Sequence, residues 1–209
     1  MGRGPDLRYE RKLWQSGLQT IAGVDEAGVG PMAGPVVAAA VIFAPEIFIR
    51  GVTDSKLLPA EKREELEIKI RDRAIAISVG VAEVAEIDRL NIYHATVSAM
   101  MRAIGGLPMK PDHVLIDGRR VKALELPQTA LVKGDRRSFC IAAASIIAKV
   151  TRDRLMREYD VRFPGYGFAQ HKGYCTSDHV AAVERLGPSP LHRTSFAPVM
   201  AAAQLKLAL

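Results

Sequence analysis

Four acidic residues stand where short apolar segments of the chain end. Asp25 and Glu26 end the first such segment, Asp117 ends a later one, and Asp135 follows another. If neighbouring strands of one sheet carry these segments, the four carboxylates meet. Carboxylate oxygens are hard ligands that suit Mg²⁺ or Mn²⁺, and like charges held this close raise one another's pKa. The pattern predicts a divalent-metal site, although single acids also occur commonly at the exposed ends of strands and helices.

Two divalent ions roughly 4 Å apart can activate a water molecule and stabilise the leaving oxygen of a phosphodiester. The products of such a displacement would be a 5′-phosphate and a 3′-hydroxyl. Adjacent strand residues point to opposite faces of a sheet, so Asp25 and Glu26 can share one site only if the backbone turns between them. The glycines that follow them would allow such a turn.

The segments that would position these acids alternate between strand and helix patterns. Apolar residues recur at every second position between Ile75 and Val81, which is typical of a half-buried strand. Pro59 precedes a charged, helix-forming stretch, where its missing N–H costs nothing. Strands are expected at residues 19–24, 36–43, 74–83, 113–116 and 130–132, and helices at 59–73, 85–104, 138–159 and 177–186. The predicted class is α/β, with a helical C-terminal extension.

Composition limits the function classes. The 209 residues carry a net charge of +6, and 48% of them are hydrophobic, so a globular core and a polyanionic partner are expected. Only Cys140 and Cys175 are present, which argues against a disulfide framework or structural zinc and favours a reducing compartment. No apolar run approaches the roughly 20 residues of a membrane span, and none resembles a signal peptide. The expected location is the cytoplasm.

Several blocks of sequence, in this order, resemble the type 2 ribonuclease H family. They are residues 25–35 (DEAGVGPMAGP), 53–56 (TDSK), 115–118 (LIDG), 133–135 (KGD), 142–153 (AAASIIAKVTRD) and 165–174 (GYGF to HKGY). The resemblance implies a ribonuclease H-like mixed five-stranded sheet flanked by helices. It also implies that Asp25, Glu26, Asp117 and Asp135 are the catalytic, metal-binding carboxylates, with Mn²⁺ or Mg²⁺ as cofactor. Asp153, which closes one block, is the next candidate acid, and it is expected either to support the metal ligands from behind or to be structural.

The implied activity is endonucleolytic cleavage of the RNA strand of RNA/DNA hybrids, with nicking of DNA 5′ of embedded ribonucleotides. Ribonucleotide excision repair and RNA primer removal would be its uses. A monomer is expected, with residues 1–187 as the catalytic domain and 188–209 as an extension, because the proline-bearing stretch 188–198 is the one weak point.

Recognition of RNA requires contact with the 2′-hydroxyl, and a glycine backbone can approach a ribose closely. Gly28, Val29 and Gly30 are therefore candidate ribose readers, and the resemblance implies that Tyr174 presses on the sugar at an RNA-to-DNA junction. The family pattern has Arg at the position of Val29, so weaker phosphate binding with intact ribose readout is expected. Candidate phosphate contacts are Lys56, Lys149, Arg152, Lys172 and Arg193.

The histidines carry less information. His171 lies in the last family block and is a candidate for substrate positioning or protonation. The others are expected to be structural or surface residues, because none has a paired nucleophile: His94, His113, His179 and His192. The final residues Gln204–Leu209 resemble the short peptide by which bacterial proteins dock on the sliding clamp, although leucine-rich helix ends are common.

Two other functions fit parts of the sequence. Glycines after a strand suggest a dinucleotide-binding oxidoreductase, but Pro31 and Pro35 bracket the loop, and β-branched residues follow where that fold needs a helix. A non-catalytic hybrid-binding module would keep the basic charge and Tyr174, yet it would not need all four acids. Retention of the four acids favours an enzyme.

Overall fold

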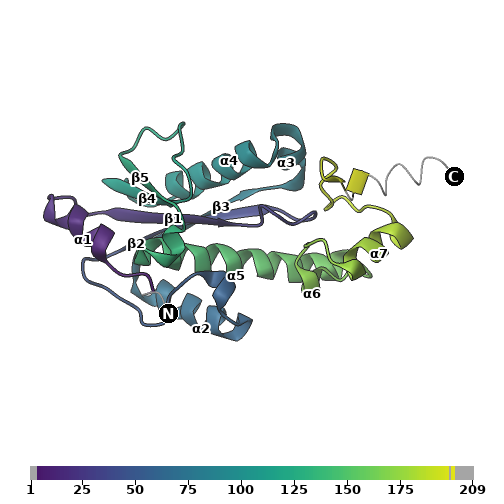
Figure 1. Ribbon diagram of the computed structural model, residues 1–209, viewed down its shortest axis with the longest axis horizontal. Helices are drawn as coiled ribbons and strands as arrows, with labels where there is room; N and C mark the ends of the chain where they lie inside the picture. Colours follow the sequence, from purple (N-terminus) through teal and green to yellow (C-terminus); the bar gives the residue numbers. More distant parts are fainter. Residues whose placement is uncertain (1–3, 198, 201–209) are drawn as a thin grey trace.

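The protein contains one mixed sheet of five strands in the order β3-β2-β1-β4-β5, seen edge-on in a computed structural model that describes residues 4–197 and 199–200 (Figure 1). The strands are β1 (Ile21–Ala27), β2 (Val36–Phe43), β3 (Ala74–Ala82), β4 (His113–Asp117) and β5 (Gln128–Leu131). Strands β1, β2 and β3 are antiparallel neighbours, whereas β4 runs parallel to both β1 and β5. The predicted α/β class and mixed sheet are confirmed.

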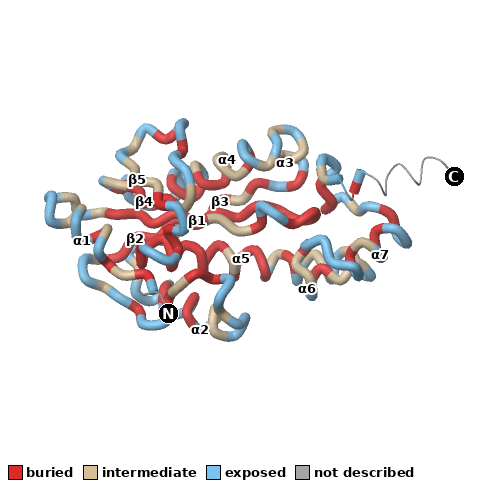
Figure 2. Tube along the Cα trace, in the orientation of Figure 1, coloured by how far each residue is buried: buried red, intermediate tan, exposed pale blue. Residues whose placement is uncertain are grey.

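Helices cover both faces of the sheet (Figure 1). Helix α4 (Ile92–Gly105) lies on one face, and α5 (Phe139–Arg162) and α2 (Ala60–Arg73) lie on the other. Strand β2 is buried throughout, and its alternate side chains enter two separate cores. Val36 and Ile42 pack toward α4, while Val41 and Phe43 pack toward α5. Figure 2 shows this buried centre between the exposed outer surfaces of the helices.

Helix α5 approaches the sheet closely because its first half is rich in alanine and because Gly23 of β1 has no side chain. A Cβ on Gly23 would overlap the backbone of Cys140. The helix begins at Ser138, whose hydroxyl accepts from the Ile141 N–H, and buried Glu10 of α1 (Arg8–Gln15) accepts from the Ser138 hydroxyl and the Cys140 N–H. The start of α5 is thereby fixed beside β1.

The structure differs from the expected elements at two places that matter. Strand β1 continues through Asp25 and Glu26 to Ala27 instead of ending before them. The expected helix 85–104 is two helices, α3 (Val84–Leu90) and α4, because Asn91 lies between them at φ 70° and its side chain caps α4 by accepting from the His94 N–H. Helix α1 and the short helix α6 (Phe168–His171) were not expected.

The chain beyond α5 forms α6 and α7 (Ser177–Leu186) at the far end of α5 and then returns toward the sheet (Figure 1). His192 and Arg193 on this returning segment are buried. The division into residues 1–187 and 188–209 stays a prediction, but the described part of the second segment is packed against the first. Within the described ranges, no helix combines the length and apolar character that a membrane crossing requires.

Candidate metal centre and substrate cleft

The first two acids lie on a strand that outruns its neighbour. Strand β1 pairs with β4 only as far as Val24, opposite Ile116, while its pairing with β2 continues to Ala27. Asp25 and Glu26 therefore lie on continuous extended backbone, and the expected turn between them is wrong. Because β4 ends at Asp117, the sheet is open on that side of β1, and side chains from both faces of β1 can approach Asp117.

Asp25 is buried on the face of β1 that packs against α5. Burial raises its pKa well above the usual value, and the charges of Glu26 and Asp117 raise it further, while the Glu26 N–H and the Ser145 hydroxyl bind the carboxylate and oppose the shift. Ser145 in turn lies 2.9 Å (Oγ–Oγ) from the Ser55 hydroxyl. Ser145 thus holds the Asp25 carboxylate, and Ser55 supports Ser145.

Glu26 starts on the opposite face of the strand, yet it interacts with the same partner. Burial and the charge of Asp117 raise its pKa to about 7, against the opposing charge of Lys56. Asp117 Oδ1 accepts from the Gly134 N–H at 2.5 Å, which ties the end of β4 to the short 3₁₀ turn η2 (Gly134–Arg136). The strand end and this turn are thus fixed to each other.

Asp135 lies on η2 and is buried. Burial and the charges of Asp54 and Asp117 raise its pKa to about 6. The four predicted acids therefore form one cluster in which Asp117 interacts electrostatically with each of the other three. The acids thus lie near one another as expected, and their role as metal ligands stays a prediction.

Lys56 supplies positive charge to this cluster from the turn η1 (Ser55–Leu57). Burial alone would lower its pKa, yet the net shift is upward because acidic side chains surround it. Those acids are Asp25, Asp54, Asp135 and Glu26. Sequence reasoning assigned no role to Asp54, which is buried, caps η1 by accepting from the Lys56 N–H, and pairs with Arg136 at 2.8 Å. In the sequence, the only indication that Asp54 matters was its place in the 53–56 motif.

The donor set fits a divalent cation. All four side chains offer hard oxygen atoms, and their mutual repulsion is relieved when a cation binds. Within the part of the chain that the structure describes, no three acidic, histidine or cysteine side chains already stand at metal-ligand spacing. The carboxylates are therefore gathered into one region, and a bound ion would have to draw them closer together.

Metal binding is expected to stabilise the protein more at pH 8 than at pH 5. A carboxyl group whose folded-state pKa lies above its unfolded value contributes stability below the unfolded pKa, and this contribution is lost as the pH rises through the folded pKa. Above that window the carboxylates are charged and repel one another, and a bound cation relieves this repulsion. For Glu26 that window runs from 4.5 to about 7, and for Asp135 from 3.8 to about 6. Thermal melts with Mn²⁺, Mg²⁺ or chelator at both pH values measure the difference. Equal shifts at pH 5 and pH 8 would contradict it.

A cavity of about 260 Å³ opens beside the acids on the side of Tyr174. Glu26, Lys56, Gly30 and Lys149 line it, together with the partly exposed side chains of Val29 (38%) and Tyr174 (43%). Gly30 has open space where a Cβ would stand, so a sugar can approach its backbone. The structure therefore brings the expected ribose readers, two of the expected lysines and an acid to one cavity.

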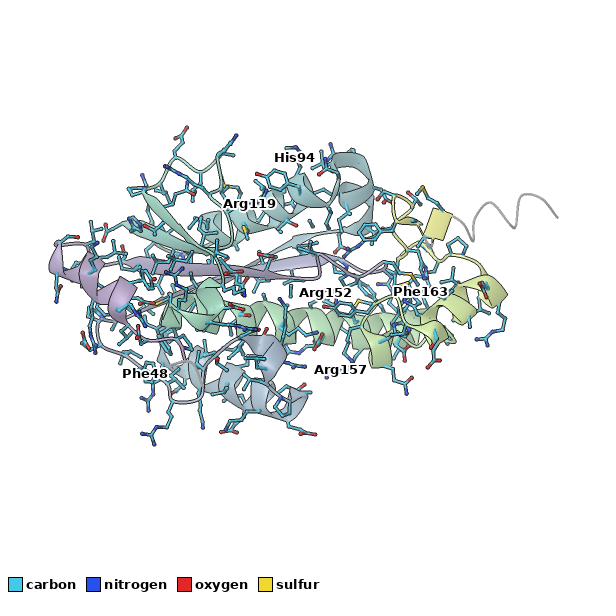
Figure 3. All side chains as sticks on the ribbon, viewed as in Figure 1. Phe48, His94, Arg119, Arg152, Arg157 and Phe163 are labelled. Atoms are coloured by element: carbon cyan, nitrogen blue, oxygen red, sulfur yellow. The ribbon has the colours of Figure 1, made fainter. Side chains whose placement is uncertain are left out.

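Gly28 differs from Gly30. Its φ is +101°, and a Cβ there would overlap the Arg152 side chain and Pro35 O, so its lack of a side chain serves packing and the loop conformation. Arg152 and Arg193 were expected to contact phosphate, and this is wrong, because both are buried (1% and 0% exposed). Figure 3 places Arg152 on the side of α5 that faces the sheet.

The two buried guanidinium groups donate to backbone carbonyls of the glycine loop, residues 28–35. Arg152 binds Pro35 O, Ala33 O and Lys172 O at 2.9–3.1 Å. Arg193 binds Gly28 O at 2.6 Å, Gly34 O and Val29 O. Burial and the neighbouring charge of Arg152 lower the pKa of Arg193 to about 9. These arginines fix the loop that carries the ribose readers.

The remaining expected residues lie around this centre. Asp153 pairs with Lys149 at 2.6 Å and with Arg63 at 3.3 Å, which agrees with a structural role. Lys149 and Lys172 also line a cavity of about 240 Å³ with Arg63 and Arg157. Both ring nitrogens of His171 are occupied by backbone groups, Tyr166 O and Gly173 N, so it has no nitrogen free for substrate.

A third cavity, of about 370 Å³, lies on the α4 side of the acids. Glu26, Asp117 and Val29 line it together with Tyr93 and the loop residues Arg119 and Arg120. Figure 3 shows Arg119 next to α4, on the connection that follows β4. Sequence reasoning missed these residues, because only the fold brings α4 beside the end of β4. The acids thus lie between two cavities that both carry positive charge.

An acidic cluster of hard ligands flanked by basic cavities is the kind of site that a metal-dependent phosphodiesterase requires. Comparisons with known proteins identify the family. The family model for ribonuclease HII matches residues 22–199. Ribonuclease HII from Myxococcus xanthus is 55% identical over 194 residues, 92% of this chain and 66% of that protein. Ribonuclease HII from Geobacter metallireducens is 55% identical over 194 residues, 90% of this chain and 91% of that one.

Solved structures agree. Ribonuclease H2 from Pyrococcus horikoshii has a TM-score of 0.77 at 27% identity and covers 89% of this chain and 98% of its own. The structure of a PCNA:RNase HII complex from Archaeoglobus fulgidus has a TM-score of 0.73 at 28% identity, with coverages of 85% and 95%. The chain belongs to the ribonuclease HII family, whose members are metal-dependent endonucleases acting on RNA in RNA/DNA hybrids. The predicted family and hydrolase class are confirmed.

Proposed function

We propose that this protein cuts DNA duplexes 5′ of embedded ribonucleotides and cleaves the RNA strand of RNA/DNA hybrids, leaving 5′-phosphate and 3′-hydroxyl ends. The observation that carries this proposal is the acidic cluster around Asp117, placed beside the cavity shared by Gly30 and Tyr174. A scissile phosphate at the acids would put its ribose against the glycine loop. Ribonucleotide excision repair and RNA primer removal are the uses that this specificity would serve.

Asp25, Glu26, Asp117 and Asp135 would hold the metal, either Mg²⁺ or Mn²⁺. When bound, such ions supply charge neutralisation and lower the pKa of a coordinated water. The chain itself contributes the alignment. Ser145 fixes Asp25, Gly134 fixes Asp117, and Lys56 offers a positive charge to a phosphate that enters the cluster.

Substrate recognition would come from the two sides of the 260 Å³ cavity. The N–H and C=O groups near Val29 and Gly30 can contact the 2′-hydroxyl, and the Tyr174 ring can lie against the sugar of the junction. Lys149 and Lys172 are placed to contact phosphates farther along the strand. The rival dinucleotide-binding fold does not apply, because the glycine loop leads into strand β2 and not into a helix.

Replacing Val29 by Arg is expected to tighten hybrid binding and to steepen its salt dependence by about one phosphate contact. The Val29 side chain is partly exposed and lines the cavities on both sides of the acids, so an arginine there can reach a phosphate. Fluorescence anisotropy of a labelled hybrid at several salt concentrations measures the slope. Val29→Gln is the uncharged control, and an unchanged slope for Val29→Arg would contradict the expectation.

One assay tests the proposed function as a whole. Labelled duplex DNA with a single ribonucleotide is incubated with the protein and Mg²⁺, Mn²⁺ or chelator, and the cut and its ends are mapped. We expect metal-dependent nicking 5′ of the ribonucleotide with a 3′-hydroxyl end. A cyclic phosphate or 3′-phosphate would show attack by the ribose 2′-hydroxyl and would overturn the proposal.

We further propose a monomer that works in the cytoplasm, which suits two free cysteines, one buried and one exposed. The archaeal relative that was solved with PCNA supports clamp docking as a property of this chain as well. The peptide Gln204–Leu209 expected to mediate it lies outside the described residues. Clamp pull-down with and without the last six residues tests this docking, and equal recovery would end it.

A further inference from the structure

Two histidines, His171 and His179, hold the backbone at Tyr174, and a third, His192, is bonded to His179. His171 Nδ1 accepts from the Gly173 N–H at 3.1 Å, and the carbonyl of His171 accepts from the Tyr174 N–H at 2.9 Å. On the other side, the Tyr174 carbonyl lies 2.8 Å from His179 Nδ1. A carbonyl oxygen can only accept, so His179 Nδ1 carries a proton and donates it.

His179 continues into His192 as a directional relay. The two Nε2 atoms lie 3.0 Å apart, so one donates and the other accepts. The Ser189 N–H donates to His192 Nδ1 at 2.9 Å, so neutral His192 carries its proton on Nε2. Neutral His179, protonated on Nδ1, has a free lone pair on Nε2. The tautomers that the two ends of the relay require are therefore compatible, because His192 Nε2–H donates to the lone pair on His179 Nε2.

The relay lies inside the protein and is attached to the glycine loop. His179 and His192 are 0% and 2% exposed, and burial lowers the pKa of each to about 4, so both are neutral at neutral pH. His192 forms a β-bridge with Ala33, and the Met32 N–H donates to Gly173 O at 3.0 Å. The His192 end of the relay is thus bonded to the glycine loop, and the His179 end is bonded to the Tyr174 carbonyl.

We propose that His179 and His192 are positioning residues for ribonucleotide recognition, which set the place of Tyr174 relative to the glycine loop through the relay from the Ser189 N–H to the Tyr174 carbonyl. The proposal rests on the proposed role of Tyr174 in reading the sugar. Each histidine acts through Tyr174 and touches no substrate itself. When the backbone carbonyl of Tyr174 is fixed, less conformational entropy is lost as the ring binds the sugar.

The tautomers of the intact protein test the relay directly. Long-range ¹H–¹⁵N spectra of ¹⁵N-histidine-labelled protein at pH 7.5 should show the proton of His179 on Nδ1 and the proton of His192 on Nε2. Assignment comes from the loss of one signal set in His179→Asn and in His192→Phe. A His179 proton on Nε2, or a charged ring on either residue, would overturn the relay.

A double-mutant cycle tests the consequence. His192→Phe keeps a ring of similar size but removes the hydrogen bonds of the ring to Ser189 and His179. We expect it to slow nicking at a single ribonucleotide by about tenfold, with a rise in KM. In a Tyr174→Ala background the same change should cost less than about twofold, because the relay then has nothing to position. His113→Phe removes a partly buried histidine of β4 that is bonded to Thr129 of β5; it is the matched control and should leave the rate unchanged.

The outcomes separate the two proposals. If Tyr174→Ala nicks at the wild-type rate, the proposed role of Tyr174 fails, and the relay's function fails with it. If Tyr174→Ala is slow but His192→Phe costs the same factor in both backgrounds, only the relay is overturned. If His192→Phe does not fold, the tautomers of the wild-type protein still decide whether the relay exists, and His179→Asn replaces His192→Phe in the cycle.

Discussion

Replacing Asp25 by Asn is expected to lower kcat by about a thousandfold or more, in the range of other losses of essential charged groups. The same change is expected to raise the melting temperature of the metal-free protein. Asp25 is buried next to Glu26 and Asp117, and both its burial and their charges raise its pKa. An amide of the same shape removes the buried charge and with it the cost of burying that charge, which raises stability. It also removes a charged oxygen that could bind the metal, which lowers activity. Activity and stability should therefore move in opposite directions.

Asp88→Asn is the matched control, since this acid serves the fold. Burial alone would raise the pKa of Asp88, but hydrogen bonds from Thr194 and Ser195 lower it. A group with a lowered pKa stabilises the folded state above its unfolded value, so its loss should cost about 1–2 kcal/mol at pH 7.5 with kcat unchanged. Differential scanning fluorimetry with chelator and single-turnover nicking measure both variants. A lower melting temperature for Asp25→Asn, or retained activity, would contradict the assignment.

The sequence predicted the acidic cluster because motif order and strand ends are local properties. The ends of the parallel strands β1 and β4 lie at one edge of the sheet, so acids near those ends had to come close together. The path of β1 was harder to predict. Polar residues normally mark the end of a strand, yet here β1 continues past β4 and pairs with β2 through Glu26. Whether a neighbouring strand ends earlier is a property of the sheet, and a single segment does not contain it.

The roles of the arginines could not be predicted for a related reason. Arginine is rarely fully buried, and sequence reasoning therefore placed Arg152 and Arg193 on phosphates. Most of their partners are backbone carbonyls of residues 28–35, more than a hundred positions away in the sequence, and carbonyl groups leave no trace in residue type. The histidine relay was hidden in the same way. His179 and His192 looked like separate structural residues until the fold joined them.

The buried arginine beneath the glycine loop gives the second large effect. Replacing Arg152 by Lys is expected to cost about 3 kcal/mol of unfolding free energy, because a lysine cannot reproduce the fork of a guanidinium group and leaves buried carbonyls unpaired. The carbonyls of Pro35, Ala33 and Lys172 all accept from Arg152. They belong to the two segments that carry the ribose readers and Tyr174, so kcat/KM at a single embedded ribonucleotide should also fall by about a hundredfold.

Arg154→Lys provides the comparison on the same helix. Arg154 is half exposed and pairs with Glu67 at 3.0 Å, so the change should cost less than about 0.5 kcal/mol and leave nicking unaltered. Urea unfolding of both variants without metal gives the stability difference, and nicking at saturating metal gives the activity. If Arg152→Lys and Arg154→Lys lose equal stability, the Arg152 bonds to the loop contribute nothing specific. If Arg152→Lys loses stability alone, the loop keeps its position without Arg152, and the reading of ribose must depend on Arg193.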